Sequence, residues 1–565
     1  MITKGISFCI FIISIFPFSI FLSKDKSYFY SWMERTPKQF VLGSTALALI
    51  FIGLSKLPKD KYPSFLSKIL KEYFQSRYII LVSVIVIFLS SNLISLLIFE
   101  HIPHIQDSIC QLFQAKIFLS GNLYTSPPVH KDFFRFLYII DNNKWYSQYP
   151  PAHSFFLMLG LLFNVPWLIN PIFGAISAIV LYKIGKEVYD LKTSNLSLLL
   201  FTASPFLIFM SSEYMNHAST MFFILLFVLY FIKMIKTVSP IPAFISGLSL
   251  GIALNIRPLE VVAIGFPFMV YLLFIFLRDK RFWKAFLSIA LGFSLMLFVL
   301  LTYNYLTNGN PLLFGYNVYE NKSNLFGFVE IPSEGLRHTP LKGFLNTLNN
   351  LYAINKYLFE WPIPSLTFIF IFFFLKNKRN QWDKIFIISS ISLLIFYFFY
   401  YFPYMTFGPR FLYSSMPFLV LLTARGVLCI PEKMAEKSYI CKESCEIAIM
   451  LIISISIIFM IVFSLPKLFN EYHGYFGVDK KLHESVEKNK IHNAVVFIDT
   501  SATNYSIGFQ YNSPELDTDV IYARDLGRKN IELMNDFTSM SYYLYRKNEK
   551  TQRFELIPLS AGVTY

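Results

Sequence analysis

Long apolar runs alternate with short polar connections along most of the 565-residue chain. A helix needs about 20 largely apolar residues to cross the hydrocarbon core of a bilayer. The pattern therefore predicts an α-helical polytopic membrane protein with about 13 transmembrane helices. The predicted spans are residues 5–22, 39–56, 78–99, 166–185, 194–210, 217–235, 241–256, 259–277, 285–305, 358–375, 385–402, 411–429 and 446–465.

Two segments depart from this pattern. The apolar run 154–164 is too short to span, so we expect a re-entrant or interfacial segment attached to the large polar loop 101–153. After about residue 466, strand-like runs at 494–498, 520–522 and 542–545 predict a small α/β domain. The predicted parts are N-terminal helices with their connection (1–77), a membrane domain (78–466) and a C-terminal α/β domain (467–565).

The composition supports membrane insertion, because 55% of the residues are hydrophobic and 18% are aromatic. The formal charge of +15 comes from Lys and Arg residues that gather in every second connection, a pattern that places these connections in the cytoplasm. We therefore expect no nucleic-acid partner. The expected topology in the cell (inner) membrane has a cytoplasmic N-terminus, with loop 101–153 and the C-terminal domain outside. The first run lacks a small-residue cleavage site, which predicts an uncleaved anchor.

Loop 101–153 contains the strongest candidate for catalysis, Asp107. Its spacing to Gln111 and Gln114 is i, i+4, i+7, which places the three side chains on one face of a helix. A carboxylate at the membrane surface can accept the proton of an acceptor hydroxyl as that hydroxyl attacks an anomeric carbon. On spacing alone, an ordinary solvated loop aspartate is the favoured explanation of this residue.

Glu213 and His217 lie in a polar connection between two apolar runs. Glu213 is a candidate second acid, either for metal binding or for orienting an acceptor. The alternative is a polar turn at the level of the lipid headgroups.

Arg257 and Arg410 are predicted at the outer ends of helices, where charge is costly unless it is paired. Two guanidiniums near one site suit a lipid phosphate, because each matches phosphate oxygens with a bidentate fork. They would also stabilise a leaving phosphate as it gains charge. The alternative is that both side chains extend to lipid headgroups.

Other polar residues complete the predicted site. Lys116 is a third candidate for binding the donor phosphate. The candidates for contacting substrate are Gln111, Gln114, Tyr124, His153, His217 and Asn304.

The five cysteines indicate no disulfide framework. Cys441 and Cys445 are spaced i, i+4, which could seat a metal, but two reduced thiols on a basic turn are the simpler explanation. We therefore predict no metal-binding residues and no cofactor. A divalent metal remains possible but is not favoured.

Taken together, these residues resemble the polyprenyl-phosphate-sugar-dependent glycosyltransferases of the GT-C fold, in the branch of the dolichyl-phosphate-mannose protein mannosyltransferases and the bacterial aminoarabinose transferase. The resemblance extends over about 80–430 and excludes the two N-terminal helices. It rests on Asp107, 114–116, 121–124, 149–153, 170–171, 182–185, 204–206, 256–258, 303–304, 309–311 and 408–410.

The resemblance implies a multi-helix membrane fold, a polyprenyl-phosphate-linked sugar donor, and transfer outside the cytoplasm with Asp107 in the catalytic position. Many relatives have a second acid next to that aspartate, whereas this chain has Ser108. Glu213 is the candidate to replace it.

The predicted function is an inverting membrane glycosyltransferase, a hexosyl or pentosyl transferase. Its acceptor would be a hydroxyl or amine on a lipid, glycan or protein. The alternative is a transporter or flippase of lipid-linked sugars, for which charged residues in the middle of helices and an inverted repeat are expected. A non-catalytic scaffold would leave Asp107 and the arginine pair unexplained.

Overall fold

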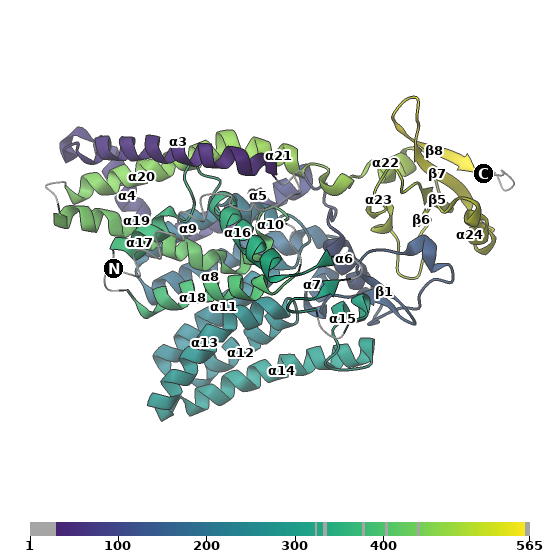
Figure 1. Ribbon diagram of the computed structural model, residues 1–565, viewed down its shortest axis with the longest axis horizontal. Coiled ribbons are helices and arrows are strands. Elements are labelled where there is room, and N and C mark those ends of the chain that lie inside the picture. Colours follow the sequence, from purple (N-terminus) through teal and green to yellow (C-terminus); the bar gives the residue numbers. More distant parts are fainter. Residues whose placement is uncertain are drawn as a thin grey trace.

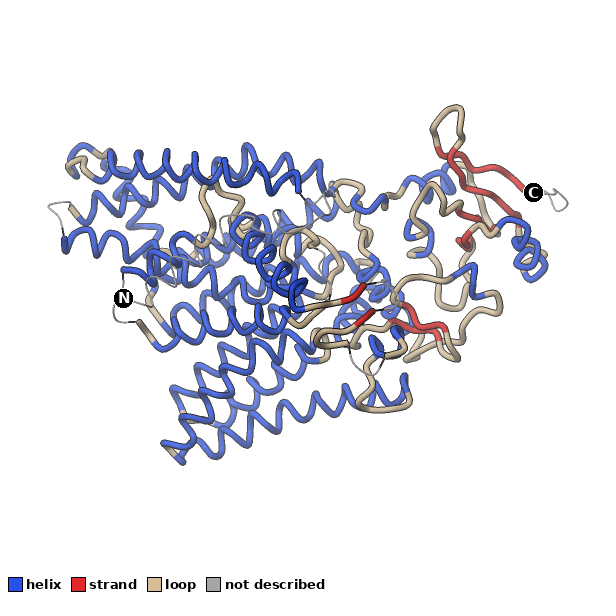
Figure 2. Tube along the Cα trace, in the orientation of Figure 1, coloured by secondary structure: helices blue, strands red, loops and turns tan. Residues whose placement is uncertain are grey.

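The computed structural model describes residues 30–322, 325–331, 336–375, 379–401, 405–437 and 441–559. A long bundle of helices forms one end of the molecule, and the C-terminal sheet forms the other (Figure 1). Figure 2 shows helix throughout the bundle, with the largest group of strands at the C-terminal end. The fold class expected from the sequence is therefore confirmed: a helical polytopic membrane protein with a small C-terminal α/β domain.

The helices are α3 (Tyr30–Ser55), α4 (Ser64–Gln75), α5 (Ile79–Leu97), α6 (Gln106–Leu119), α7 (Pro151–Leu162), α8 (Ile169–Val188), α9 (Leu191–Thr202), α10 (Pro205–Met210), α11 (His217–Thr237), α12 (Pro240–Leu254), α13 (Pro258–Arg278), α14 (Trp283–Asn308), α15 (Gly315–Glu320), α16 (Pro340–Tyr357), α17 (Thr367–Leu375), α18 (Gln381–Phe398), α19 (Met416–Lys437), α20 (Lys442–Phe459), α21 (Leu465–Tyr472), α22 (Lys481–Lys488), α23 (Ser506–Phe509) and α24 (Asn530–Asp536).

Nine helices within the described ranges are long and apolar enough to cross a membrane. The first predicted span, 5–22, lies outside the described residues. Three other predicted spans are shorter than expected: 194–210 is split into α9 and α10, 241–256 is the 15-residue α12, and 358–375 keeps only the nine residues of α17. The count of 13 is therefore not confirmed, although the class is.

Proline explains where the run 194–210 breaks. Pro205 has no N–H to donate, so a helix can begin at it but cannot continue through it without losing a bond. Ser204 caps the new helix α10, because its side-chain oxygen accepts a hydrogen bond from the backbone N–H of Leu207. The short run 154–164 lies mostly in α7, which at 12 residues is too short to span, as expected.

The C-terminal domain contains a four-stranded sheet in the order β6-β5-β7-β8. β5 pairs in parallel with both β6 and β7, and β8 pairs antiparallel with β7. The three strands expected from the sequence are present, and the fourth, β8, was not predicted. The strands are β5 (Ala494–Ile498), β6 (Val520–Arg524), β7 (Ser541–Lys547) and β8 (Phe554–Leu559).

The sheet shares one hydrophobic core with the outer loop. The ring centroid of Phe113 in α6 lies 5.5 Å from that of Phe509. The ring of Phe136 in the loop stacks on Phe509, with 4.4 Å between the two centroids. A hairpin within the loop closes this core, and Trp145 on its second strand is 1% exposed. The loop hairpin is β1 (Ile139–Asp141) with β2 (Trp145–Ser147), and a second small hairpin is β3 (Glu330–Ile331) with β4 (Leu336–Arg337).

Small residues let α12 and α14 approach closely inside the bundle. A Cβ atom added to Gly247 would lie 2.0 Å from the carbonyl oxygen of Ile289, and one added to Gly292 would lie 2.3 Å from that of Phe244. Such contacts between small residues are a common way for membrane helices to pack.

Gly247→Ala should therefore push α12 away from α14 and destabilise the protein by about 1–3 kcal/mol. Gly53→Ala is the matched control, because a Cβ at Gly53 meets nothing within 4 Å. Thermal unfolding of both purified variants in detergent measures the difference. Equal midpoints for the two variants would contradict the close approach.

Candidate active site

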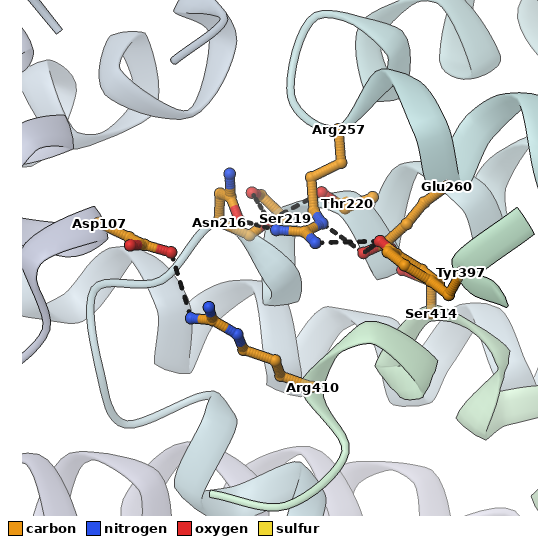
Figure 3. Close-up of polar contacts among 9 residues, drawn as sticks. All are labelled: Asp107, Asn216, Ser219, Thr220, Arg257, Glu260, Tyr397, Arg410 and Ser414. Carbon is orange, nitrogen blue, oxygen red and sulfur yellow. Dashed lines mark hydrogen bonds and ion pairs between the residues drawn. The ribbon is translucent and has the colours of Figure 1, made fainter. Parts of the chain in front are cut away.

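Asp107 lies in the first turn of α6, where the structure pairs it with Arg410. Arg410 Nη1 donates to Asp107 Oδ2 at 3.1 Å, and the two side chains are 5% and 17% exposed (Figure 3). The two residues are 303 positions apart in the sequence. A carboxylate in the first turn of a helix is also stabilised by the helix dipole.

The turn before Arg410 depends on Gly408. Its φ of +113° is a backbone conformation that side chains other than glycine rarely adopt, and a Cβ there would lie 2.9 Å from the Cβ of Tyr357. The chain then enters the 3-10 helix Arg410–Ser415, whose first residue carries the guanidinium toward α6. In the Gly-Pro-Arg sequence, the glycine therefore allows the turn and the arginine pairs with Asp107.

Arg257 is held by a network of buried groups just before α13. Its Nε donates to Glu260, its Nη1 to Asn216 Oδ1 at 3.0 Å and its Nη2 to the Tyr397 hydroxyl at 3.2 Å (Figure 3). Glu260, which is 0% exposed, also accepts hydrogen bonds from Tyr397 at 3.1 Å and from Ser414. The guanidinium is therefore neutralised by a buried carboxylate and fixed in direction from three helices.

Both arginines lie beside the ring of Phe411. The guanidinium carbon of Arg257 is 5.6 Å from the ring centroid, and that of Arg410 is 5.0 Å away. Each guanidinium makes a cation–π interaction with this ring, so one aromatic side chain holds both cations close together. The structure thus brings together three residues that the sequence predicted: Asp107, Arg257 and Arg410.

His217 is completely buried at the start of α11, near these arginines. Neither ring nitrogen has a hydrogen-bond partner in the part of the chain that the structure describes. Because an unpaired buried polar group is costly, the two ring nitrogens keep a hydrogen-bonding capacity that the described residues do not use. His153 differs: its ring nitrogens bond Ser219 Oγ at 2.9 Å and the Tyr214 carbonyl at 2.8 Å, and burial lowers its pKa to about 4.

Glu213 is buried against the first turn of α6. Its carboxylate accepts hydrogen bonds from the His104 N–H at 3.0 Å and from Ser108 Oγ at 2.7 Å. Burial raises its pKa to about 7, although these bonds favour the charged form. Ser108 thus donates to Glu213, the acid that the sequence suggested as the second acid of the site.

Lys116, the third candidate for binding the donor phosphate, bonds to the C-terminal domain instead. Lys116 Nζ donates to the carbonyls of Gln510 and Asn512 at 2.7 and 2.8 Å, and burial lowers its pKa to about 8. The structure therefore directs Lys116 to the C-terminal domain and not to Arg410.

Gln114 fixes the loop, because its amide donates to the Leu123 carbonyl at 2.9 Å and accepts from the Ser147 N–H at 3.0 Å. Asn304 donates to the Pro311 carbonyl at 3.1 Å. The ring of Tyr124 lies 4.4 Å from Lys144 Nζ. Gln111 is 1% exposed, and its carbonyl oxygen has no partner among the described residues.

Sequence reasoning missed four members of the Arg257 network: Asn216, Glu260, Tyr397 and Ser414. The i, i+3 spacing of Arg257 and Glu260 is a readable ion-pair signal. Tyr397 and Ser414 are 137 and 154 positions from Glu260 in the sequence, so no local sequence pattern predicts their contact with it.

Within the described ranges, no group of three His, Cys, Asp or Glu residues is arranged to hold a metal ion. Cys441 is exposed and Cys445 is buried, and both are free thiols.

Comparison with known proteins agrees with this fold. A family model described as Dolichyl-phosphate-mannose-protein mannosyltransferase matches residues 149–303. No curated protein matches the chain. The matched segment contains Glu213, His217, Arg257 and Glu260, whereas Asp107 and Arg410 lie outside it.

Solved structures of membrane glycosyltransferases are similar to the chain. ArnT from Cupriavidus metallidurans in the apo state has a TM-score of 0.51 and 11% identity, covering 84% of this chain and 92% of that chain. ArnT from the same organism bound to undecaprenyl phosphate has a TM-score of 0.49 and 13% identity, and the match covers 83% of this chain and 92% of that chain. The apo oligosaccharyltransferase from Archaeoglobus fulgidus has a TM-score of 0.44 and 11% identity, and the match covers 84% of this chain and 70% of that chain.

The resemblance expected from the sequence is confirmed. The fold is that of the polytopic GT-C membrane proteins, and residues 149–303 match a model of a glycosyltransferase family. Its fold is shared with apo ArnT from Cupriavidus metallidurans over most of both chains.

Glu260→Gln should leave the guanidinium of Arg257 buried without a counter-charge and destabilise the protein by about 3–5 kcal/mol. Glu432→Gln, on the exposed surface of α19, is the matched control. The midpoint of thermal unfolding should fall for the first variant and stay unchanged for the second. An unchanged midpoint for Glu260→Gln would show that Arg257 does not depend on this carboxylate.

Glu213 should make the protein less stable as pH rises. Its pKa in the folded state, about 7, is above the ordinary 4.5, so the folded state binds this proton more tightly than the unfolded state does. The resulting stabilisation is complete below pH 4.5 and is lost as pH rises through 7, by about 3 kcal/mol.

Unfolding midpoints measured between pH 5 and 8 test this expectation. Glu213→Gln should remove this part of the pH dependence while keeping both hydrogen bonds, because Ser108 can accept from the amide. Glu549→Gln, which changes an exposed carboxylate, should follow the wild type. The same pH profile for wild type and Glu213→Gln would contradict the raised pKa.

Proposed function

We propose that the protein transfers a sugar from a polyprenyl-phosphate donor to an acceptor hydroxyl or amine, with inversion at the anomeric carbon. The observation that carries the proposal is the contact between Asp107 and Arg410 beside Phe411, with Arg257 on the same ring. A proton acceptor and two phosphate-binding cations are thereby assembled at one place. The name of the matched family, which contains dolichyl-phosphate-mannose, supports a donor of this class.

Asp107 acts as the general base in this reaction. Its carboxylate takes the proton of the acceptor as the acceptor oxygen or nitrogen forms a bond to the anomeric carbon. The bond between that carbon and the phosphate oxygen breaks, and the lipid phosphate leaves with one additional negative charge. Attack on the face opposite the leaving phosphate inverts the configuration.

Arg410 and Arg257 bind the donor phosphate and stabilise the charge that it gains. Both guanidiniums are held in place by ion pairs, so they need little reorganisation during the reaction. Because these two guanidiniums carry the phosphate charge, the proposed reaction requires no divalent metal.

The ion pair between Asp107 and Arg410 also links donor binding to the base. Without a donor, each side chain neutralises the other at 3.1 Å. A donor phosphate competes for the Arg410 guanidinium and releases the Asp107 carboxylate to accept a proton. The base is thus freed when the sugar is in place.

His217 contributes a hydrogen bond to the donor. It is buried beside both arginines and has no partner among the described residues, so its N–H is available to a phosphate or sugar oxygen. Gln111 offers a free carbonyl from α6 in the same way.

We propose that the site opens on the extracytoplasmic side of the cell membrane, with the C-terminal domain on that side and the N-terminus in the cytoplasm. α6 and loop hairpin β1–β2 lie at the end of the bundle that carries the C-terminal domain (Figure 1). The basic residues of the connections after α11, α13 and α19 support the opposite end as cytoplasmic.

Asp107→Asn tests the function, because it removes the base while nearly keeping the shape of the side chain. Membranes containing wild-type protein should transfer radiolabel from polyprenyl-phosphate sugars to endogenous acceptors, and the variant should lose at least about 100-fold in rate. Asp132→Asn, on the exposed surface of the same loop, is the matched control and should keep full activity.

Equal transfer by wild type and a normally expressed Asp107→Asn would exclude Asp107 as the base. Absence of transfer from every polyprenyl-phosphate donor, with normal expression, would contradict the enzyme itself.

A further inference from the structure

A polar cleft of about 710 Å³ lies between the outer loop, α15 and the C-terminal domain. Gln106 and Arg135 line it from the loop, Tyr319 from α15, and Arg524 from the end of β6. Gln106 precedes Asp107 in the first turn of α6. The cleft therefore reaches the helix turn that carries the proposed base.

The charge of the cleft favours an anion. Arg135 and Arg524 are its basic lining residues, and Asp141 is its acidic one. Neither guanidinium forms an ion pair with any residue in the described part of the chain. Arginines that face a cleft without a carboxylate partner are suited to bind carboxylate or phosphate groups of a ligand.

The remaining lining resembles a surface for sugar rings. Phe136 and Tyr319 offer aromatic groups from two sides, and Thr500, Thr503 and Asn504 offer hydroxyl and amide groups from the C-terminal domain. Ser506 also lines the cleft, and its buried Oγ has no hydrogen-bond partner among the described residues. A ligand hydroxyl would satisfy that oxygen.

These features argue against a lipid chain as the occupant. The cleft lies outside the helices of the described ranges that are long and apolar enough to span, and more of its lining residues carry hydroxyl, amide or charged groups than are apolar or aromatic. Acyl chains bind where apolar side chains dominate. A carbohydrate combines apolar ring faces with many hydroxyl groups, and so matches both parts of the lining.

We propose that this cleft binds the acceptor of the reaction and that the acceptor is an acidic glycan, one whose sugars carry carboxylate or phosphate groups. Arg135 and Arg524 bind the acidic groups, the aromatic residues contact the ring faces, and the end near Gln106 delivers a hydroxyl to Asp107. This inference rests on the proposed function, because an acceptor site requires a transfer reaction.

Binding of defined oligosaccharides to the full-length protein in detergent tests the proposal. The probes are uronic-acid-containing, phosphorylated and neutral oligosaccharides of three to six residues, together with a Ser/Thr-rich peptide of matching negative charge. Calorimetry should show binding of at least one acidic series, with the neutral oligosaccharides weaker by about tenfold or more. The peptide should not bind.

The double variant Arg135→Gln/Arg524→Gln should lose about tenfold or more of the affinity for the acidic oligosaccharide. Arg528→Gln is the matched control, because Arg528 is exposed on the same domain and does not line the cleft. Equal unfolding midpoints for the double variant and the control would show that the loss is not due to misfolding. Unchanged affinity in the double variant, binding of no oligosaccharide, or preferential binding of the peptide would overturn the proposal.

Asp107→Asn separates this inference from the proposed function. The variant should bind the acidic oligosaccharide as the wild type does, because Asp107 does not line the cleft. Glycan binding without transfer by the wild type would contradict the enzyme and keep the cleft as a glycan site. Transfer by the wild type without glycan binding would contradict the cleft alone.

Discussion

The structure of the site depends on neutralising two guanidiniums at the starts of helices. Each is too costly to bury alone, and each has one carboxylate: Glu260 for Arg257 and Asp107 for Arg410. The two pairs differ in a way that matters for chemistry. Glu260 accepts three hydrogen bonds and is fully buried, whereas Asp107 has Arg410 as its one ion-pair partner among the described residues and is partly exposed. The first pair fixes a cation, and the second leaves a carboxylate within reach of a substrate.

The sequence identified which charged residues are candidates for the site, and the structure shows how they contact one another. Asp107, Arg257 and Arg410 stood out because they follow apolar runs, where any charged residue needs a reason. Glu260 escaped notice because it lies at the start of the apolar run 259–277 and was absorbed into a predicted span. Tyr397 and Ser414 come from helices distant in the sequence, and only packing of α18 and the 3-10 helix before α19 brings them to Glu260.

Helix and strand positions were predictable where the local signal was strong. β5 matches the apolar run 494–498 at both ends, because it is central in its sheet and buried on both faces. β8 has a mixed sequence, Phe-Glu-Leu-Ile-Pro-Leu, and lies at an edge, where the pattern is weaker and proline is tolerated. Hydropathy alone also overestimates the length of a helix. Three apolar runs contain short or broken helices, since burial by neighbouring helices makes residues apolar whether or not they belong to one continuous helix.

The core shared by the C-terminal sheet and the outer loop limits how freely this protein could be rearranged. Phe113, Phe136 and Trp145 come from the loop, yet they pack with Phe509 of the C-terminal domain, and Lys116 bonds two carbonyls there. A cut at the end of the last helix would follow the topology but divide one hydrophobic core into two halves. The C-terminal domain is thus not a module that can be exchanged alone between relatives. Any graft that changes it must carry the matching loop.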